Sequence, residues 1–167
     1  MPYLNNNGVR IYYRTEGAGS PVVLMHGASQ DMEIWTEYGY VDALKQSHQV
    51  ILVDFRGHGH SDKPHDSAAY TLERCVSDVV AVLDALGIKK AHYVGYSRGG
   101  WIGFGMAKHA QDRVLSLTIG GTYPYEDSMA DWRNTWAGKT TAEVQANAVS
   151  KGSVYSAWRR IRFLAND

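Results

Sequence analysis

The sequence predicts an α/β fold in which a mostly parallel open sheet carries helices on both faces. Short runs rich in Val, Ile, Leu and Tyr recur along the 167 residues, and helix-like stretches separate the later runs. Two of the runs, at residues 22–25 and 50–53, are continuously apolar. Strands that alternate with helices pair in parallel, and a strand covered on both faces has no polar side. Together these patterns indicate a doubly wound sheet.

Five strands are predicted, at residues 9–14, 21–25, 48–54, 90–95 and 114–119. The first of them alternates between apolar and polar residues and is followed by the turn-rich Glu-Gly-Ala-Gly-Ser-Pro, so we expect it toward an antiparallel edge. The clearest helix spans residues 71–86, where apolar residues recur at helical spacing and Gly87 can cap the end.

The balance of charged residues in the sequence argues against some classes of binding partner. Seventeen basic residues balance seventeen acidic ones, which gives no reason to expect nucleic acid or an anionic membrane as a partner. No apolar run approaches the ~18 residues of a membrane span, and the N-terminal residues lack the pattern of a signal peptide. We therefore expect a cytoplasmic protein that binds a small, neutral or weakly charged molecule.

Three polar loops follow predicted parallel strands, and ligands of such sheets bind beyond the carboxyl ends of the strands. The loops begin at His26, Asp54 and Gly95. The third contains Gly95-Tyr96-Ser97-Arg98-Gly99, a G-x-S-x-G pattern between a predicted strand and a predicted helix. A serine on such a sharp turn is pushed clear of the sheet, and its flanking residues must be small. Ser97 is therefore the candidate nucleophile.

These loops resemble the motifs of the α/β-hydrolase superfamily, in its esterase, haloperoxidase-like and C-C hydrolase branch. The motifs are His26-Gly27, Asp54-x-Arg56-Gly57-His58-Gly59-x-Ser61 and Gly95-Tyr96-Ser97-Arg98-Gly99-Gly100. The resemblance implies a nucleophile at Ser97 and an oxyanion hole formed by the backbone N–H groups of Ala28 and Arg98. It implies structural roles for Gly95, Gly99, Gly100, His26, Gly27, Asp54, Arg56 and Gly57. A serine in place of aspartate argues against the epoxide-hydrolase and dehalogenase branches.

The resemblance also requires an acid and a histidine after the nucleophile. The one histidine after Ser97 is His109, twelve positions along the predicted helix, or roughly 18 Å at ~1.5 Å per residue. It cannot be the base. Three upstream histidines, at positions 26, 58 and 60, share the rim with Ser97, but a structural role is favoured for each. Glu126 and Asp127 stand where some members place the acid.

The simplest interpretation is a hydrolase cut off after the sixth strand of this fold, as the first part of a longer protein or the product of a shortened gene. We expect a core at residues 1–122 and a helical, cap-like segment at 123–167. An uncovered strand at 114–119 would present an unpaired edge. We therefore expect a homo-oligomer joined there, or the segment after Thr122 folded across it.

The predicted function is hydrolysis of small carboxylic esters through Ser97, without a cofactor or metal and with the triad acid and histidine missing from this chain. One alternative is a non-catalytic binding or interaction protein that keeps the hydrolase pocket. Another is a metallohydrolase, because His58-x-His60-x-Asp62 resembles the metal-binding run of the metallo-β-lactamase fold. In that run Lys63 stands where a further histidine is expected, so the α/β-hydrolase motif is the preferred interpretation.

Overall fold

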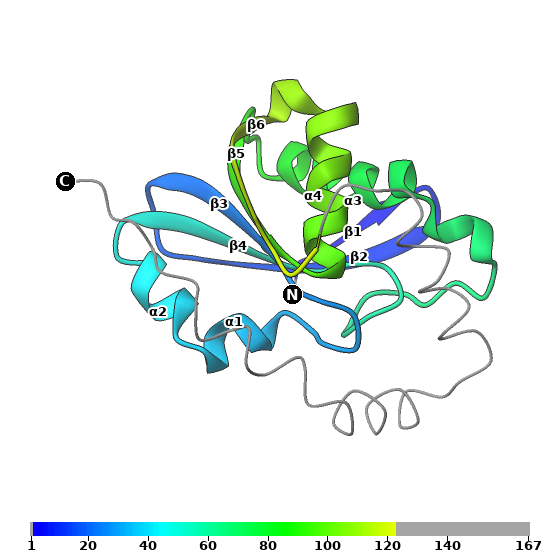
Figure 1. Ribbon diagram of the computed structural model, residues 1–167, viewed down its shortest axis with the longest axis horizontal. Coiled ribbons are helices and arrows are strands. Elements are labelled where there is room, and N and C mark those ends of the chain that lie inside the picture. Colours follow the sequence, from blue (N-terminus) through cyan, green and yellow to red (C-terminus); the bar gives the residue numbers. More distant parts are fainter. Residues whose placement is uncertain (1, 123–167) are drawn as a thin grey trace. The chain divides into compact units, whose positions relative to one another are not determined.

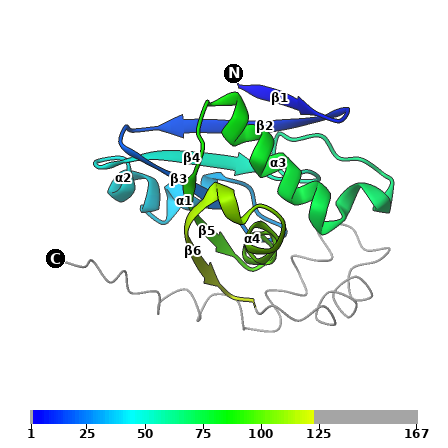
Figure 2. The ribbon, with the colours of Figure 1, turned by 90° about the horizontal axis from the view of Figure 1, so that it is seen from above.

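A computed structural model describes residues 2–122, which lie in one compact unit. Its sheet has the strand order β1-β2-β4-β3-β5-β6, which Figure 2 shows from one edge to the other. The strands are β1 (Tyr3–Asn6), β2 (Val9–Glu16), β3 (Ser20–Met25), β4 (His48–Asp54), β5 (Ala91–Tyr96) and β6 (Val114–Gly120). The α-helices are α1 (Glu33–Glu37), α2 (Tyr40–Leu44), α3 (Leu72–Ala85) and α4 (Arg98–His109). Single 3₁₀ turns lie at Ser67–Tyr70 and Gln111–Arg113.

The predicted fold class is confirmed. β3 pairs in parallel with β4 and β5, and β5 pairs in parallel with β6. β2 pairs with β4 in antiparallel orientation, as its alternating sequence indicates. The sequence prediction missed β1, which pairs with β2 and forms the edge itself. β1 is four residues long and half polar, so it has no apolar run by which a strand could be predicted. Its pairing with β2 depends on backbone hydrogen bonds.

Helices cover both faces of the sheet, with α1 and α2 below it in Figure 1 and α3 and α4 above it. Because side chains alternate along a strand, each buried strand supplies both layers. Val23 and Ile51 belong to the core formed with α3 and α4, whereas their neighbours Val22 and Val50 are buried toward the opposite face. The continuously apolar runs are thus explained by two-sided burial.

A buried ion pair fastens the loop after β4 to α3. Arg56 Nε lies 2.6 Å from Asp78 Oδ2, and Arg56 Nη2 lies 2.7 Å from Asp78 Oδ1. Both side chains are almost fully buried. Asn6 donates a further hydrogen bond of 2.7 Å to the same carboxylate from β1. Arg56 therefore fixes the start of the loop after β4 against α3.

β6 pairs with β5 on one side, and among residues 2–122 no strand pairs with its other side. Leu115 on this strand is 50% exposed. None of the helices in the described part of the chain is both long and apolar enough to cross a bilayer. The predicted helical segment at 123–167 lies outside the described residues, so that segment and the division at residue 122 stay predictions.

Candidate functional site

Ser97 occupies the turn between β5 and α4 in a conformation that few residues adopt. Its φ is 51° and its ψ is −110°. A non-glycine residue at positive φ is strained and persists only where its surroundings fix it. Here the Ser97 N–H donates to the carbonyl of Gly120 at 2.8 Å, and the Ser97 carbonyl accepts from Trp101 in the first turn of α4 at 3.0 Å. The backbone geometry is that of a nucleophile elbow.

The three glycines around Ser97 leave no room for a side chain. A Cβ on Gly95 would overlap the carbonyl of Gly99, and a Cβ on Gly99 would overlap the carbonyl of Met25. A Cβ on Gly100 would lie 2.6 Å from the Thr122 methyl carbon. The clashes at Gly95 and Gly99 involve backbone, which cannot move aside as a flexible side chain can. The spacing of small residues in the motif thus reflects close packing of α4 on β5 and on the loop after β3.

The loop after β3 passes beside Ser97. A Cβ added to Gly27 in this loop would lie only 3.5 Å from Ser97 Cβ. Within this loop the Gly27 N–H donates to Gln30 Oε1 at 3.1 Å, and the Ser29 N–H donates to His58 Nε2 at 3.3 Å. The Ala28 N–H between them has no hydrogen-bond partner among residues 2–122. Arg98 is the first residue of α4, and the N–H groups of a first helical turn point out of its N-terminal end.

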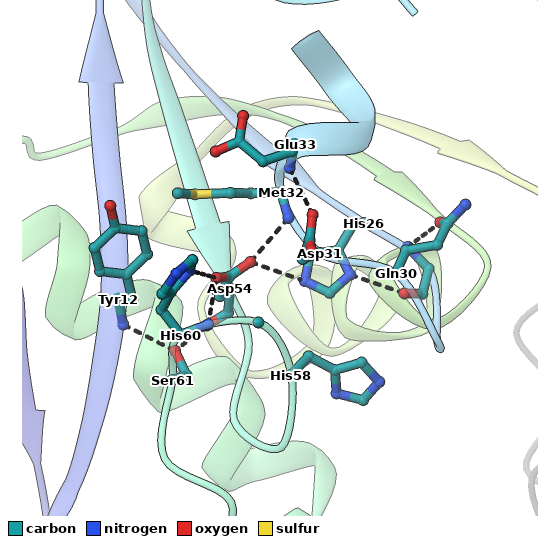
Figure 3. Close-up of polar contacts among 12 residues, drawn as sticks. Tyr12, His26, Gln30, Asp31, Met32, Glu33, Asp54, His58, His60 and Ser61 are labelled. Carbon is teal, nitrogen blue, oxygen red and sulfur yellow. Dashed lines mark hydrogen bonds and ion pairs between the residues drawn. The ribbon is translucent and has the colours of Figure 1, made fainter. Parts of the chain in front are cut away.

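Asp54 and His26 make polar contacts within the loops after β4 and β3 (Figure 3). The buried Asp54 carboxylate accepts hydrogen bonds from the Met32 and His60 backbone N–H groups, both at 2.8 Å. The His26 ring stacks on Phe55 with 4.4 Å between centroids, and its Nδ1 donates to the Gly27 carbonyl at 2.8 Å. Gly57 has a φ of 86°, which favours glycine, and a Cβ there would lie 2.7 Å from the Tyr70 ring. These contacts connect the loop after β3 with the loop after β4.

The buried His26 and the half-buried His58 are weak bases. Burial lowers the pKa of His26 to about 4, although its hydrogen bond to Gly27 partly offsets that effect. Burial, and after it the neighbouring His26, lowers the pKa of His58 to about 3. Both rings are neutral near pH 7, but groups with such low pKa values accept a proton from serine poorly. Neither histidine is therefore a good general base for Ser97.

The metal-site alternative is wrong for His58, His60 and Asp62. Asp62 binds Arg10 at 2.9 Å, and the His60 ring lies 4.9 Å from the Tyr12 ring. His58 points away from both, toward the loop after β3. Among residues 2–122 no group of three His, Cys, Asp or Glu side chains is arranged to hold a metal ion. The spacing of His58, His60 and Asp62 suggested that their side chains meet at one point, but the turn directs the three side chains to different neighbours.

His109 ends α4 and lies 3.7 Å from Glu73 Oε1. Since α4 is continuous from Arg98, the estimate of roughly 18 Å from Ser97 stands. Two other serines do have a histidine partner, Ser47 with His48 at 2.9 Å and Ser116 with His92 at 2.7 Å. Both pairs lie toward the amino ends of their strands, away from the elbow. Glu126 and Asp127 lie outside the described residues.

A hollow of about 550 Å³ also lies at the amino ends of β5 and β6, far from the polar rim. It is lined by Asp84, Gly87, Ile88, Lys89, Lys90, Asp112 and Arg113. Arg113 already donates to Asp84 at 2.7 Å and to the Lys89 carbonyl at 2.8 Å, so its main donors are occupied. The hollow contributes nothing to the chemistry at Ser97.

Comparison with known proteins agrees with this geometry. A family model described as "alpha/beta hydrolase fold" matches residues 20–164. Cis-3-alkyl-4-alkyloxetan-2-one decarboxylase of Shewanella oneidensis is 40% identical over 121 residues, which cover 70% of this chain and 37% of that protein. Epoxide hydrolase 3 of Siraitia grosvenorii is 32% identical over 116 residues, covering 68% and 36%.

A solved structure of an N-acyl homoserine lactone degrading enzyme superposes with a TM-score of 0.67 and 38% identity. The match covers 80% of this chain and 53% of that enzyme. The chain thus spans well under half the length of the two curated relatives and about half that of the solved structure.

Proposed function

This chain belongs to the α/β-hydrolase fold family, and from that premise we propose that it is a serine hydrolase that cleaves small carboxylic esters through Ser97. The observation that carries the proposal is the strained backbone of Ser97, with φ of 51° and ψ of −110°, on a turn whose neighbouring glycines leave no room for a side chain. Such strain is retained where it exposes a reactive group.

In the proposed reaction the Ser97 hydroxyl attacks the carbonyl carbon of the ester, and the carbonyl oxygen becomes an oxyanion. The N–H groups of Ala28 and Arg98 would donate hydrogen bonds to that oxyanion. Fixed donors of this kind stabilise the transition state more than the substrate. The N-terminal end of α4 adds a partial positive charge at the same place. The alcohol leaves, and water then hydrolyses the acyl-enzyme.

Two of the relatives carry a cyclic ester in their names, an oxetan-2-one and a homoserine lactone. Lactones therefore belong beside open-chain esters among the substrates to be tried. The epoxide hydrolase shares the fold with this chain at 32% identity. Our preference for ester over epoxide chemistry rests on the serine, rather than aspartate, at position 97.

The hydroxyl proton needs a base, but four of the histidines within residues 2–122 have hydrogen bonds elsewhere: His26 donates to Gly27, His58 accepts from Ser29, and His48 and His92 bond other serines. Two more, His60 and His109, lie beside the carboxylates of Asp54 and Glu73. We therefore expect slow turnover, since an oxyanion hole and substrate binding alone give a rate about 10³ to 10⁴ times that of the uncatalysed reaction in water. Imidazole is small enough to act as a diffusible base, and it should raise the turnover that depends on Ser97.

The test is the hydrolysis of p-nitrophenyl esters and chromogenic lactones by the full chain, with and without imidazole. Imidazole also hydrolyses such esters by itself, so the rate of Ser97→Ala under the same conditions is subtracted. We expect a slow difference rate that increases with imidazole concentration. A difference rate of zero throughout would overturn the proposal and favour the alternative, a non-catalytic protein that binds ligands at this rim without turning them over.

We also propose a homo-oligomer that pairs along β6, and a cytoplasmic location. The support for the oligomer is the unpaired side of β6 within residues 2–122 and the half-exposed Leu115. Light scattering of the purified chain should give at least twice the monomer mass, and Leu115→Lys should lower that mass. A monomer at all concentrations tested would refute the pairing.

A further inference from the structure

We propose that His58 and Gln30 are positioning residues, which hold the loop at 26–30 so that the Ala28 N–H faces the reacting carbonyl. This inference rests on the proposed function of Ser97 and concerns how the predicted oxyanion hole is kept in shape. Neither side chain would touch the substrate. Each acts through a backbone N–H that neighbours Ala28.

The pattern of hydrogen bonds in the loop supports the proposal. Three consecutive N–H groups, those of Gly27, Ala28 and Ser29, follow one another beside the elbow. The first donates to Gln30 at 3.1 Å and the third donates to His58 at 3.3 Å. The middle group has no such partner among residues 2–122. Because both flanking peptide groups are fixed in direction, the orientation of the Ala28 N–H is fixed as well.

The loop needs this restraint because its backbone is strained. Ser29 has a φ of 63°, in the left-handed region that non-glycine residues seldom occupy. Such a conformation persists when surrounding contacts determine it. The bond from the Ser29 N–H to His58 is the contact that ties this residue to the loop after β4.

His58 is itself held firmly enough to serve as a fixed acceptor. Its ring lies 4.1 Å from the Phe55 ring and 5.6 Å from the His26 ring, measured between centroids. To accept from Ser29, Nε2 must carry a lone pair, so the ring is neutral with its proton on Nδ1. Burial lowers the pKa of His58 to about 3, so the ring stays neutral throughout the neutral range, and the bond from Ser29 selects the tautomer. Figure 3 shows Gln30 and His58 on the same rim, with His60 directed away from it.

The kinetic test replaces His58 with phenylalanine, which keeps an aromatic ring against Phe55 and removes the acceptor. Misplacing one oxyanion donor should lower kcat by about 10- to 100-fold, less than the loss of about 10² to 10³ that follows when a donor is removed altogether. KM should change little, because the interaction strengthens only in the transition state. His58→Gln can offer an oxygen near the position of Nε2 and should restore part of the loss. Gln30→Ala should lower kcat in the same way, and Gln30→Glu should not.

His60→Phe is the matched control, since His60 belongs to the same loop and its side chain is 67% exposed. It should retain the native kcat. A thermal melt of each variant separates a misplaced loop from an unfolded chain. A His58→Phe variant that keeps native kcat and native folding would overturn the proposal.

A second readout does not depend on turnover. Nitrogen chemical shifts should show His58 Nε2 without a proton between about pH 5 and 8. This pH range lies about two to five units above the lowered pKa of His58. The Ser29 amide should exchange with solvent faster in His58→Phe than in His60→Phe. Unchanged exchange, or a protonated Nε2, would refute the positioning role even in an inactive protein. If exchange responds as expected but no turnover depends on Ser97, the loop restraint stands and the hydrolase proposal fails.

Discussion

Replacing Ser97 with alanine should abolish the acyl-enzyme and all of the ester turnover that imidazole stimulates, and should leave only the slow rate that the oxyanion hole and binding sustain without a nucleophile, about 10³ to 10⁴ times the rate in water. Alanine removes the attacking oxygen and leaves the backbone unchanged, because the bonds that hold the turn involve the Ser97 N–H and carbonyl. Initial rates of p-nitrophenyl butyrate hydrolysis by the two full chains measure the effect. The melting temperatures of the two chains should coincide, since alanine at this φ carries the same backbone strain as serine.

The matched control is Ser116→Ala. Ser116 is bonded to His92 at 2.7 Å, so it is the kind of surface serine that could give background reaction with an activated ester. Its removal should leave the turnover unchanged. If Ser97→Ala stayed as active as the native chain while Ser116→Ala lost activity, the site would be misassigned.

Replacing Arg56 with leucine should lower the free energy of unfolding by about 3–5 kcal/mol, because it leaves the Asp78 carboxylate buried without its partner. The guanidinium makes two bonds to that carboxylate, of 2.6 and 2.7 Å, and a third of 2.7 Å to the Ala69 carbonyl. Urea unfolding followed by circular dichroism measures the loss. We expect the loop that carries His58 to exchange its amides faster as well.

Two further variants make this result interpretable. Arg10→Leu breaks an ion pair of similar length, 2.9 Å to Asp62, but the Arg10 side chain is 63% exposed. That change should lower the free energy of unfolding far less than Arg56→Leu does, because water screens an exposed ion pair. The double variant Arg56→Leu/Asp78→Leu should recover much of the loss, since no unpaired charge remains buried. If Arg56→Leu costs no more than Arg10→Leu, the buried pair does not hold the loop.

Much of the fold could be predicted because its signals are local. The apolar runs at 22–25 and 50–53 predict buried parallel strands, and G-x-S-x-G between a strand and a helix predicts the turn at Ser97. β1 escaped prediction because Tyr-Leu-Asn-Asn carries no strong strand pattern. Its place depends on long-range contacts such as the bond from Asn6 to Asp78, 72 residues apart.

The site could be predicted less completely. The contact between Ser29 and His58 joins residues 29 positions apart, and the bond from the Gly27 N–H to Gln30 depends on a loop shape that spacing does not reveal. The metal hypothesis failed for the same reason. Gly57 and Gly59, at φ of 86° and 49°, turn the chain so that His58 and His60 face different neighbours. A sequence pattern gives residue types but not side-chain directions.

The most direct test of the account is covalent labelling of the full chain with a fluorophosphonate, read by mass spectrometry of the intact protein and its peptides. The reagent phosphonylates a serine that an oxyanion hole assists, because the phosphonyl oxygen occupies that hole. We predict one adduct, on Ser97, that forms faster with added imidazole and is absent from Ser97→Ala. An adduct on another residue, or equal labelling of native and Ser97→Ala chains, would contradict the assignment of Ser97 as the nucleophile.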